Sequence, residues 1–172
     1  MRKLISFVCM MTCFASIAQN KNLPCSAPEA SQFNFWIGDW NLTYNDTLHA
    51  TNHVEKIMGS CTVQENFHDP NTNYNGKSWS VYNKNYNMWQ QTWVDDQGGY
   101  IALTGEMHGD SMVLATAEKT VPANISATGK MTNRMVYHNI TKDAFDWDWE
   151  SSTDGGTTWK NNWHIHYTRK NS

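Results

Sequence analysis

Hydrophobic and polar residues alternate with a period of two along most of this chain, and short clusters of Gly, Asn and Asp interrupt the alternation. This pattern is typical of β-strands with one buried face, and the clusters supply residues that suit tight turns. We therefore predict ten short strands that pair antiparallel with their neighbours along the chain. The predicted strands span residues 40–44, 51–58, 61–67, 78–82, 88–94, 100–107, 111–116, 132–139, 144–151 and 161–169.

The two ends of this pattern favour closure into a barrel. Gly38 lets the chain bend sharply into the first strand, and Trp40 can plug the barrel floor beneath the guanidinium of Arg169 on the last strand. Closure also removes the exposed edges that a sandwich leaves. We predict an all-β fold, an antiparallel up-and-down barrel of about ten strands, with a short helical segment at 28–37 closing one end and a loop at 117–131 across a mouth.

Residues 1–18 have the pattern of a secretory signal peptide, with two basic residues, an apolar stretch and small residues before the expected cleavage site. Residues 19–172 are then expected to form a single barrel domain that is exported to a periplasmic or extracellular space. Its two cysteines, Cys25 and Cys61, are expected to form a disulfide in that oxidising compartment. No second apolar stretch is long enough to span a bilayer.

The charge balance narrows the class of partner. Without the predicted signal peptide the chain has 11 basic and 16 acidic residues, a net charge of −5. An acidic surface with no basic run argues against nucleic acid and anionic membranes as partners. A small-molecule partner remains, and the oligomeric state is left open.

Residues 152–159 match the Asp-box spacing S-x-D-x-G-x-T-W. We predict a structural role, in which the Asp154 side chain caps backbone amides of a hairpin turn and Trp159 packs beneath it. A carbohydrate site would need several copies of the motif on propeller blades, and this chain has one.

Several segments together resemble one family. They are F-N-F-W-I-G-D-W at 33–40, G-x-C at 59–61 with Q-E-N at 64–66, W-x-Q-x-W-V-D at 89–95, D-G-G-T-T-W at 154–159 and Y-x-R at 167–169. They are similar to exported bacterial proteins of unknown function that open F-D-F-W-I-G-E-W and are regarded as lipocalin-like. The resemblance implies a calycin-type barrel outside the cytoplasm and no reaction. His164 and His166 depart from the family, for which less titratable residues are expected on the last strand.

A carboxylate in the middle of an apolar strand face is the main candidate for function. Alternation places Glu65 between Val63 and Phe67, and a buried charge needs a partner, for which Arg134 is the predicted candidate. Polar residues at strand middles among large aromatics are typical of a small-ligand pocket. The predicted ligand-binding residues are Glu65, Ser78, Tyr82, Trp89, Gln91, Trp93, Arg134 and Trp147.

Other interpretations of the same residues stay open. Glu65 and Arg134 could form an internal ion pair that fixes strand register in a filled barrel, leaving a structural or interaction protein. A barrel enzyme of isomerase or cyclase type could use Glu65 as its acid or base. Burial would raise the pKa of Glu65 and Arg134 would lower it, and the sequence leaves the sign of the shift open.

His164 and His166 share one face of the last strand, and Asp146 lies on the strand before it. Histidines with a nearby carboxylate suit a metal ion. However, the aromatic residues of both strands share the opposite face, so a charge-paired exterior explains the pattern and no metal is predicted. No cofactor is predicted either, although a haem ligand among the seven histidines is not excluded.

Overall fold

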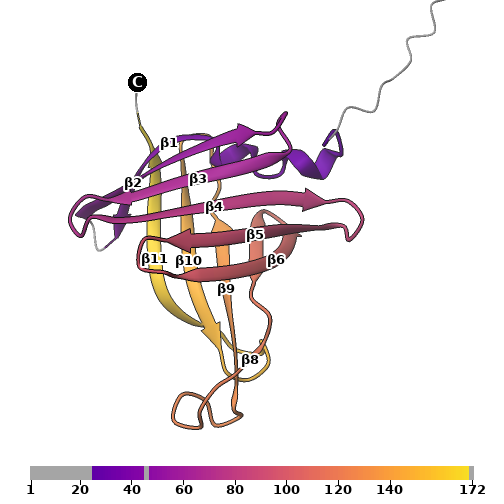
Figure 1. The fold of residues 1–172 in the computed structure, drawn as a ribbon, viewed down its shortest axis with the longest axis vertical. Helices are drawn as coiled ribbons and strands as arrows, with labels where there is room; N and C mark the ends of the chain where they lie inside the picture. The colour runs from indigo at the N-terminus through magenta and orange to yellow at the C-terminus, as the bar shows by residue number, and fades with distance from the viewer. Residues whose placement is uncertain (1–24, 45–46, 171–172) are drawn as a thin grey trace, which may run out of the picture.

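Ten strands of the computed structural model, which describes residues 25–44 and 47–170, pair edge to edge in a closed antiparallel barrel (Figure 1). Each strand pairs with its neighbours along the chain, and the last returns to the first, so the predicted all-β up-and-down barrel is confirmed. The order around the barrel is β1 (Gly38–Tyr44), β2 (Thr47–Ile57), β3 (Thr62–Asp69), β4 (Tyr74–Asn83), β5 (Met88–Asp95), β6 (Tyr100–His108), β7 (Ser111–Ala115), β9 (Lys130–His138), β10 (Ala144–Ser152) and β11 (Lys160–Arg169).

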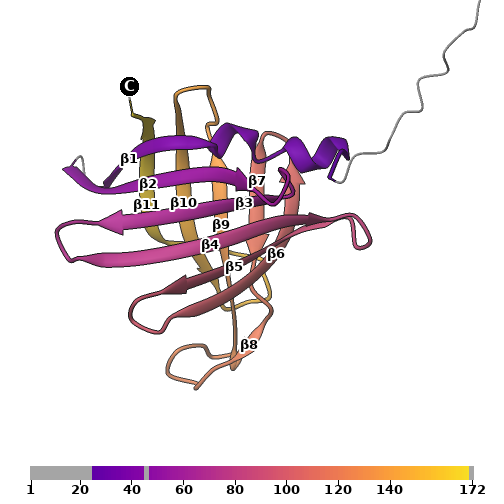
Figure 2. The ribbon, with the colours of Figure 1, turned by 45° about the horizontal axis from the view of Figure 1, so that its top comes forward.

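Two short 3₁₀ helices precede the barrel, η1 (Pro28–Ser31) and η2 (Asn34–Trp36). Figure 2 shows them at one end of the barrel, near the turn between β6 and β7. The buried Phe33 between them packs edge-on against Trp89 and Tyr137, with ring centroids 4.7 and 5.5 Å apart. An aromatic floor therefore closes this end.

A clasp of Gly38, Trp40 and Arg169 joins the two ends of the barrel. Trp40 is fully buried, and the guanidinium carbon of Arg169 lies 4.2 Å from the centre of its ring. The same guanidinium donates hydrogen bonds to the carbonyl oxygens of Ile37 (2.9 Å) and Phe35 (3.3 Å). One side chain thus holds the last strand, the first strand and the floor together.

A disulfide joins Cys25 to Cys61, with the two Cα atoms 5.1 Å apart, so the predicted pairing is confirmed. It ties the segment before η1 to the turn between β2 and β3. No helix within the described ranges is long and apolar enough to cross a membrane. The predicted signal peptide lies outside the described residues.

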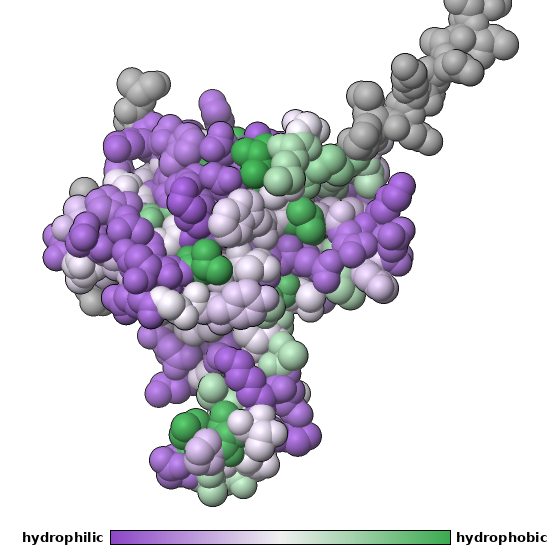
Figure 3. Space-filling view, viewed as in Figure 1, coloured by the Kyte–Doolittle hydropathy of each residue, from purple (hydrophilic) through white to green (hydrophobic). Residues whose placement is uncertain are grey.

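The long segment between β7 and β9 carries a short strand, β8 (Lys119–Thr120), which pairs with β9. It packs against the Asp-box hairpin, because the hydroxyl groups of Ser126 and Thr128 lie 3.4 and 2.7 Å from the carbonyl oxygen of Thr153. In Figure 3 the barrel face is largely hydrophilic, and hydrophobic residues gather at the tip of this segment. None of its residues lines the cavity inside the barrel.

In the Asp box, the Asp154 carboxylate accepts hydrogen bonds from the backbone amide and the hydroxyl group of Thr158, at 2.9 and 2.6 Å. These bonds lower the pKa of Asp154 to about 2. The Trp159 indole donates to the carbonyl oxygen of Gly156. The motif therefore shapes the turn between β10 and β11.

Candidate functional site

A cavity of about 180 Å³ lies inside the barrel, at the end opposite the aromatic floor. Its walls come from β3, β4, β5, β6, β9, β10 and β11, because strand alternation turns every second side chain inward. A cavity of roughly 150 Å³ is enough to hold benzene. The lining residues are Glu65, Phe67, Tyr74, Trp93, Ile101, Met135, Tyr137, Trp147, Trp149, Trp163, Ile165 and Tyr167.

Three tryptophans on β10 and β11 form one wall of the cavity. The rings of Trp147 and Trp149 are almost parallel, with centroids 6.3 Å apart, and Trp163 meets Trp147 edge-on at 5.6 Å. Trp163 remains 38% exposed, which places it at the mouth. Because the three rings pack against one another, they form a rigid, preformed apolar surface.

The opposite wall is fixed by Trp93. Its indole nitrogen donates a hydrogen bond to the carboxylate of Asp95, which also accepts one from the Tyr74 hydroxyl at 2.9 Å. Gly76 makes room for the indole, because a Cβ at Gly76 would lie 2.0 Å from the Trp93 ring. Burial, followed by the hydrogen bond to Asp95, raises the pKa of Tyr74 to about 12, so its hydroxyl group stays protonated and donates.

Glu65 provides the carboxyl group of this cavity. Its side chain is 6% exposed, and its two oxygens accept hydrogen bonds from the Asn52 amide and the Ser78 hydroxyl, both at 2.6 Å. Burial raises the pKa of Glu65 to about 7, and the two hydrogen bonds offset only part of that effect. Near neutral pH the group is therefore divided between its charged and neutral forms.

The predicted pair between Glu65 and Arg134 is wrong. Arg134 lies on the outside of β9, where its Nε is 2.5 Å from Glu150 and its guanidinium covers the Trp159 ring at 3.9 Å. The prediction placed Arg134 on the wrong face of β9. Tyr137 and Met135 pair with the inward-facing Trp147 and Trp149 of β10, so they point inward and Arg134, between them and the strand start, points outward. Within the described ranges, no lysine or arginine contacts the Glu65 carboxyl group.

The other predicted ligand residues divide into three groups. Trp93 and Trp147 line the cavity, while Ser78 is buried behind Glu65 as its hydrogen-bond donor. Gln91 is buried but does not line the cavity, and its amide donates a hydrogen bond to the Ser80 hydroxyl at 2.9 Å. Tyr82 and Trp89 instead belong to the closed end, where the Trp89 indole donates to Gln32 and its ring meets Tyr82 at 5.8 Å.

Sequence reasoning missed Asn52, Tyr137 and Tyr167 as parts of the site. Burial raises the pKa of both tyrosines well above the ordinary value, and the nearby Glu65 charge adds to the increase. Their hydroxyl groups therefore stay protonated beside the carboxyl group. The signal for Asn52 was its position between Ala50 and Val54 on one strand face, which repeats the pattern of a polar residue among apolar neighbours.

Comparison of the sequence with protein-family models gives no match, and comparison with curated proteins gives none either. The closed antiparallel barrel itself fits a lipocalin-like fold. Any assignment of function therefore rests on the cavity and on the residues that line it.

Proposed function

We propose that the barrel binds a small, partly apolar molecule in its interior. The observation that supports this best is a cavity of about 180 Å³ with aromatic walls and one buried carboxyl group that has no cationic partner among the described residues. Pockets of this composition bind apolar groups on their walls and orient the ligand through a few polar contacts.

The geometry favours a ligand of about one ring that carries a hydroxyl or amino group. The ring would contact the tryptophans, and its polar group would reach Glu65, whose two oxygens each have a remaining acceptor position in the charged form. About ten non-hydrogen atoms at roughly 0.6 kcal/mol each give a Kd on the order of tens of micromolar.

Export is the second part of the proposal. The Cys25–Cys61 disulfide supports it, because disulfides persist in oxidising compartments and are rare in the cytosol. The signal-peptide pattern of residues 1–18 points in the same direction.

A barrel enzyme that uses Glu65 as acid or base is the alternative, and the pKa of about 7 favours it, since such a group exchanges protons readily near neutral pH. Glu65→Gln separates the two functions. In an enzyme this variant would keep its substrate bound and lose turnover, whereas in a binding protein it would change affinity alone.

Filling the cavity is expected to weaken binding of the probe. Ile101 lines the cavity, while the adjacent Tyr100 points outward and is 68% exposed. Ile101→Trp therefore adds an indole to the inner face of β6, and Tyr100→Trp adds one to its outer face. With 4-fluorobenzyl alcohol as the probe and ¹⁹F NMR as the measurement, Ile101→Trp should bind at least about tenfold more weakly than the parent chain. Tyr100→Trp should bind as the parent does.

Equal affinity of the parent and Ile101→Trp would show that the probe binds elsewhere. No binding of the probe to the parent chain at millimolar concentration would contradict a cavity that accepts one ring. Thermal unfolding of both variants provides the check that each is folded.

A further inference from the structure

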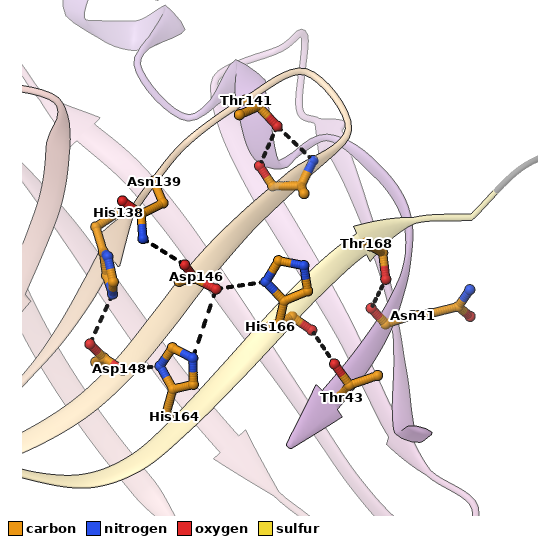
Figure 4. A network of polar contacts seen from close by, with 11 residues as sticks. Asn41, Thr43, His138, Asn139, Thr141, Asp146, Asp148, His164, His166 and Thr168 are labelled. Carbon is orange, nitrogen blue, oxygen red and sulfur yellow. Dashed lines mark hydrogen bonds and ion pairs between the residues drawn. The ribbon is translucent and has the colours of Figure 1, made fainter. Parts of the chain in front are cut away.

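Three histidines and two aspartates meet on the outside of the barrel, away from the interior cavity (Figure 4). They are His138 on β9, Asp146 and Asp148 on β10, and His164 and His166 on β11. Strand register brings them together, since Asp148 lies opposite His164, and Asp146 lies opposite both His166 and His138. His138 comes from a third strand, which the spacing of the other residues did not reveal.

The Asp148 carboxylate lies between two imidazoles. One of its oxygens is 2.6 Å from Nδ1 of His164, and the other is 2.9 Å from Nε2 of His138. One ligand atom from each of these three residues lies within 4.8 Å of the other two. Donor atoms of a tetrahedral site with bonds of about 2.1 Å are roughly 3.4 Å apart, so the three groups lie at about the spacing that such a site needs.

Asp146 lies on the other side of His164, at ion-pair rather than hydrogen-bond distance. Its Oδ1 lies 3.8 Å from Nε2 of His164, while Nδ1 of the same ring faces Asp148. Asp146 is itself held by the Asn139 amide at 2.7 Å and by His166 at 2.6 Å. A carboxylate that orients the second ring nitrogen of a ligating histidine is the usual outer shell of a metal site.

The two carboxylates of this cluster are largely shielded from solvent. The side chains of Asp146 and Asp148 are only 15% and 13% exposed, although both lie on the outer face. Their contacts within the described part of the chain are histidines and asparagines, and neither carboxylate contacts a lysine or arginine. Two shielded carboxylates among imidazole nitrogens are a donor set that suits a divalent cation.

We propose that His138, Asp148 and His164 bind a divalent transition-metal ion, with Zn²⁺ as the matching ion. Two imidazole nitrogens and one carboxylate oxygen are a donor set that zinc accepts with a water molecule in the fourth position. Ca²⁺ and Mg²⁺ prefer sites built from oxygen atoms alone and fit this donor set poorly. The competing interpretation is a charge-paired surface that binds no ion.

Isothermal titration of the tag-free chain with Zn²⁺ tests the proposal. We expect one Zn²⁺ per chain, and at least about tenfold weaker binding in both His138→Asn and His164→Asn. His53→Asn is the matched control, because His53 also pairs with a carboxylate, that of Asp39 at 2.8 Å, and no second imidazole of the described residues joins that contact. Its Zn²⁺ affinity should equal that of the parent.

Thermal unfolding gives a second readout. Zn²⁺ should raise the Tm of the parent and of His53→Asn, and leave the Tm of the His138→Asn, His164→Asn double variant unchanged. The Tm values without metal show whether each variant is folded. Absence of Zn²⁺ binding to the parent, equal binding to all variants, or Ca²⁺ binding as tight as that of Zn²⁺ would each overturn the proposal.

Discussion

Gly38→Ala is expected to lower the free energy of unfolding by about 4 kcal/mol. Gly38 has a φ angle of +132°, which residues with a side chain rarely adopt, and strain of this kind costs roughly 1–3 kcal/mol. A Cβ at Gly38 would also lie 2.3 Å from Nη1 of Arg169. The guanidinium would have to leave the carbonyl oxygens that it contacts, and each such hydrogen bond contributes about 1 kcal/mol. Urea unfolding measures the change.

Gly59→Ala is the matched control for this prediction. Gly59 also has a positive φ angle, +66°, but no heavy atom lies within 4 Å of the position of its Cβ. Gly59→Ala should therefore lower the free energy of unfolding only by the cost of backbone strain, about 1 kcal/mol. In addition, Arg169→Ala and Gly38→Ala should cost less together than the sum of their separate effects, because they disrupt one contact. Equal losses for Gly38→Ala and Gly59→Ala would disprove the clasp.

Glu65 should make the folded chain less stable as the pH rises from about 4.5 to about 7. Burial raises the pKa of Glu65 from an ordinary value of 4.5 to about 7, so over this range the folded state binds more protons than the unfolded state. The stability that Glu65 contributes is fully present below pH 4.5 and is lost as the pH passes 7. A shift of this size corresponds to about 3 kcal/mol.

Comparison of the parent with Glu65→Gln isolates this effect from that of other titratable groups. The stability of Glu65→Gln relative to the parent should increase by about 3 kcal/mol between pH 4.5 and pH 8, as measured by urea unfolding. Glu106→Gln, at an exposed position on β6, controls for the loss of a carboxylate at the surface. A constant difference between the parent and Glu65→Gln across this range would mean that Glu65 is not buried as described.

The barrel could be predicted from the sequence because its strands have one apolar and one polar face. The clasp could also be predicted, because Gly38 and Trp40 stand at the start of the strand pattern and Arg169 stands at its end. The disulfide followed from two cysteines in the part of the chain expected to be exported. These features depend on local sequence and on the order of the elements.

The position of Arg134 could not be predicted in this way. Apolar residues lie on both faces of β9, with Val136 outward and Met135 and Tyr137 inward, so alternation alone does not select the inner face. The choice depends on which residues of β10 are already inside. The pKa of Glu65 depends on the position of Arg134 as well, because a guanidinium beside the carboxyl group would lower the pKa that burial raises.

Contacts between residues on three different strands could not be predicted from the sequence either. His138 joins His164 and Asp148 only through the register of three strands, and this register is a property of the closed barrel rather than of any one segment. The cavity itself depends on how twelve side chains share the interior, which no period in the sequence describes.

Native mass spectrometry of the chain purified from its own host, without denaturation, tests the central claim that the interior holds a ligand. The parent chain should carry one small molecule, which the Ile101→Trp variant lacks because its cavity is filled. Tyr100→Trp should carry the same molecule as the parent. The claim is contradicted if the parent carries no bound species, or if Ile101→Trp retains the same molecule.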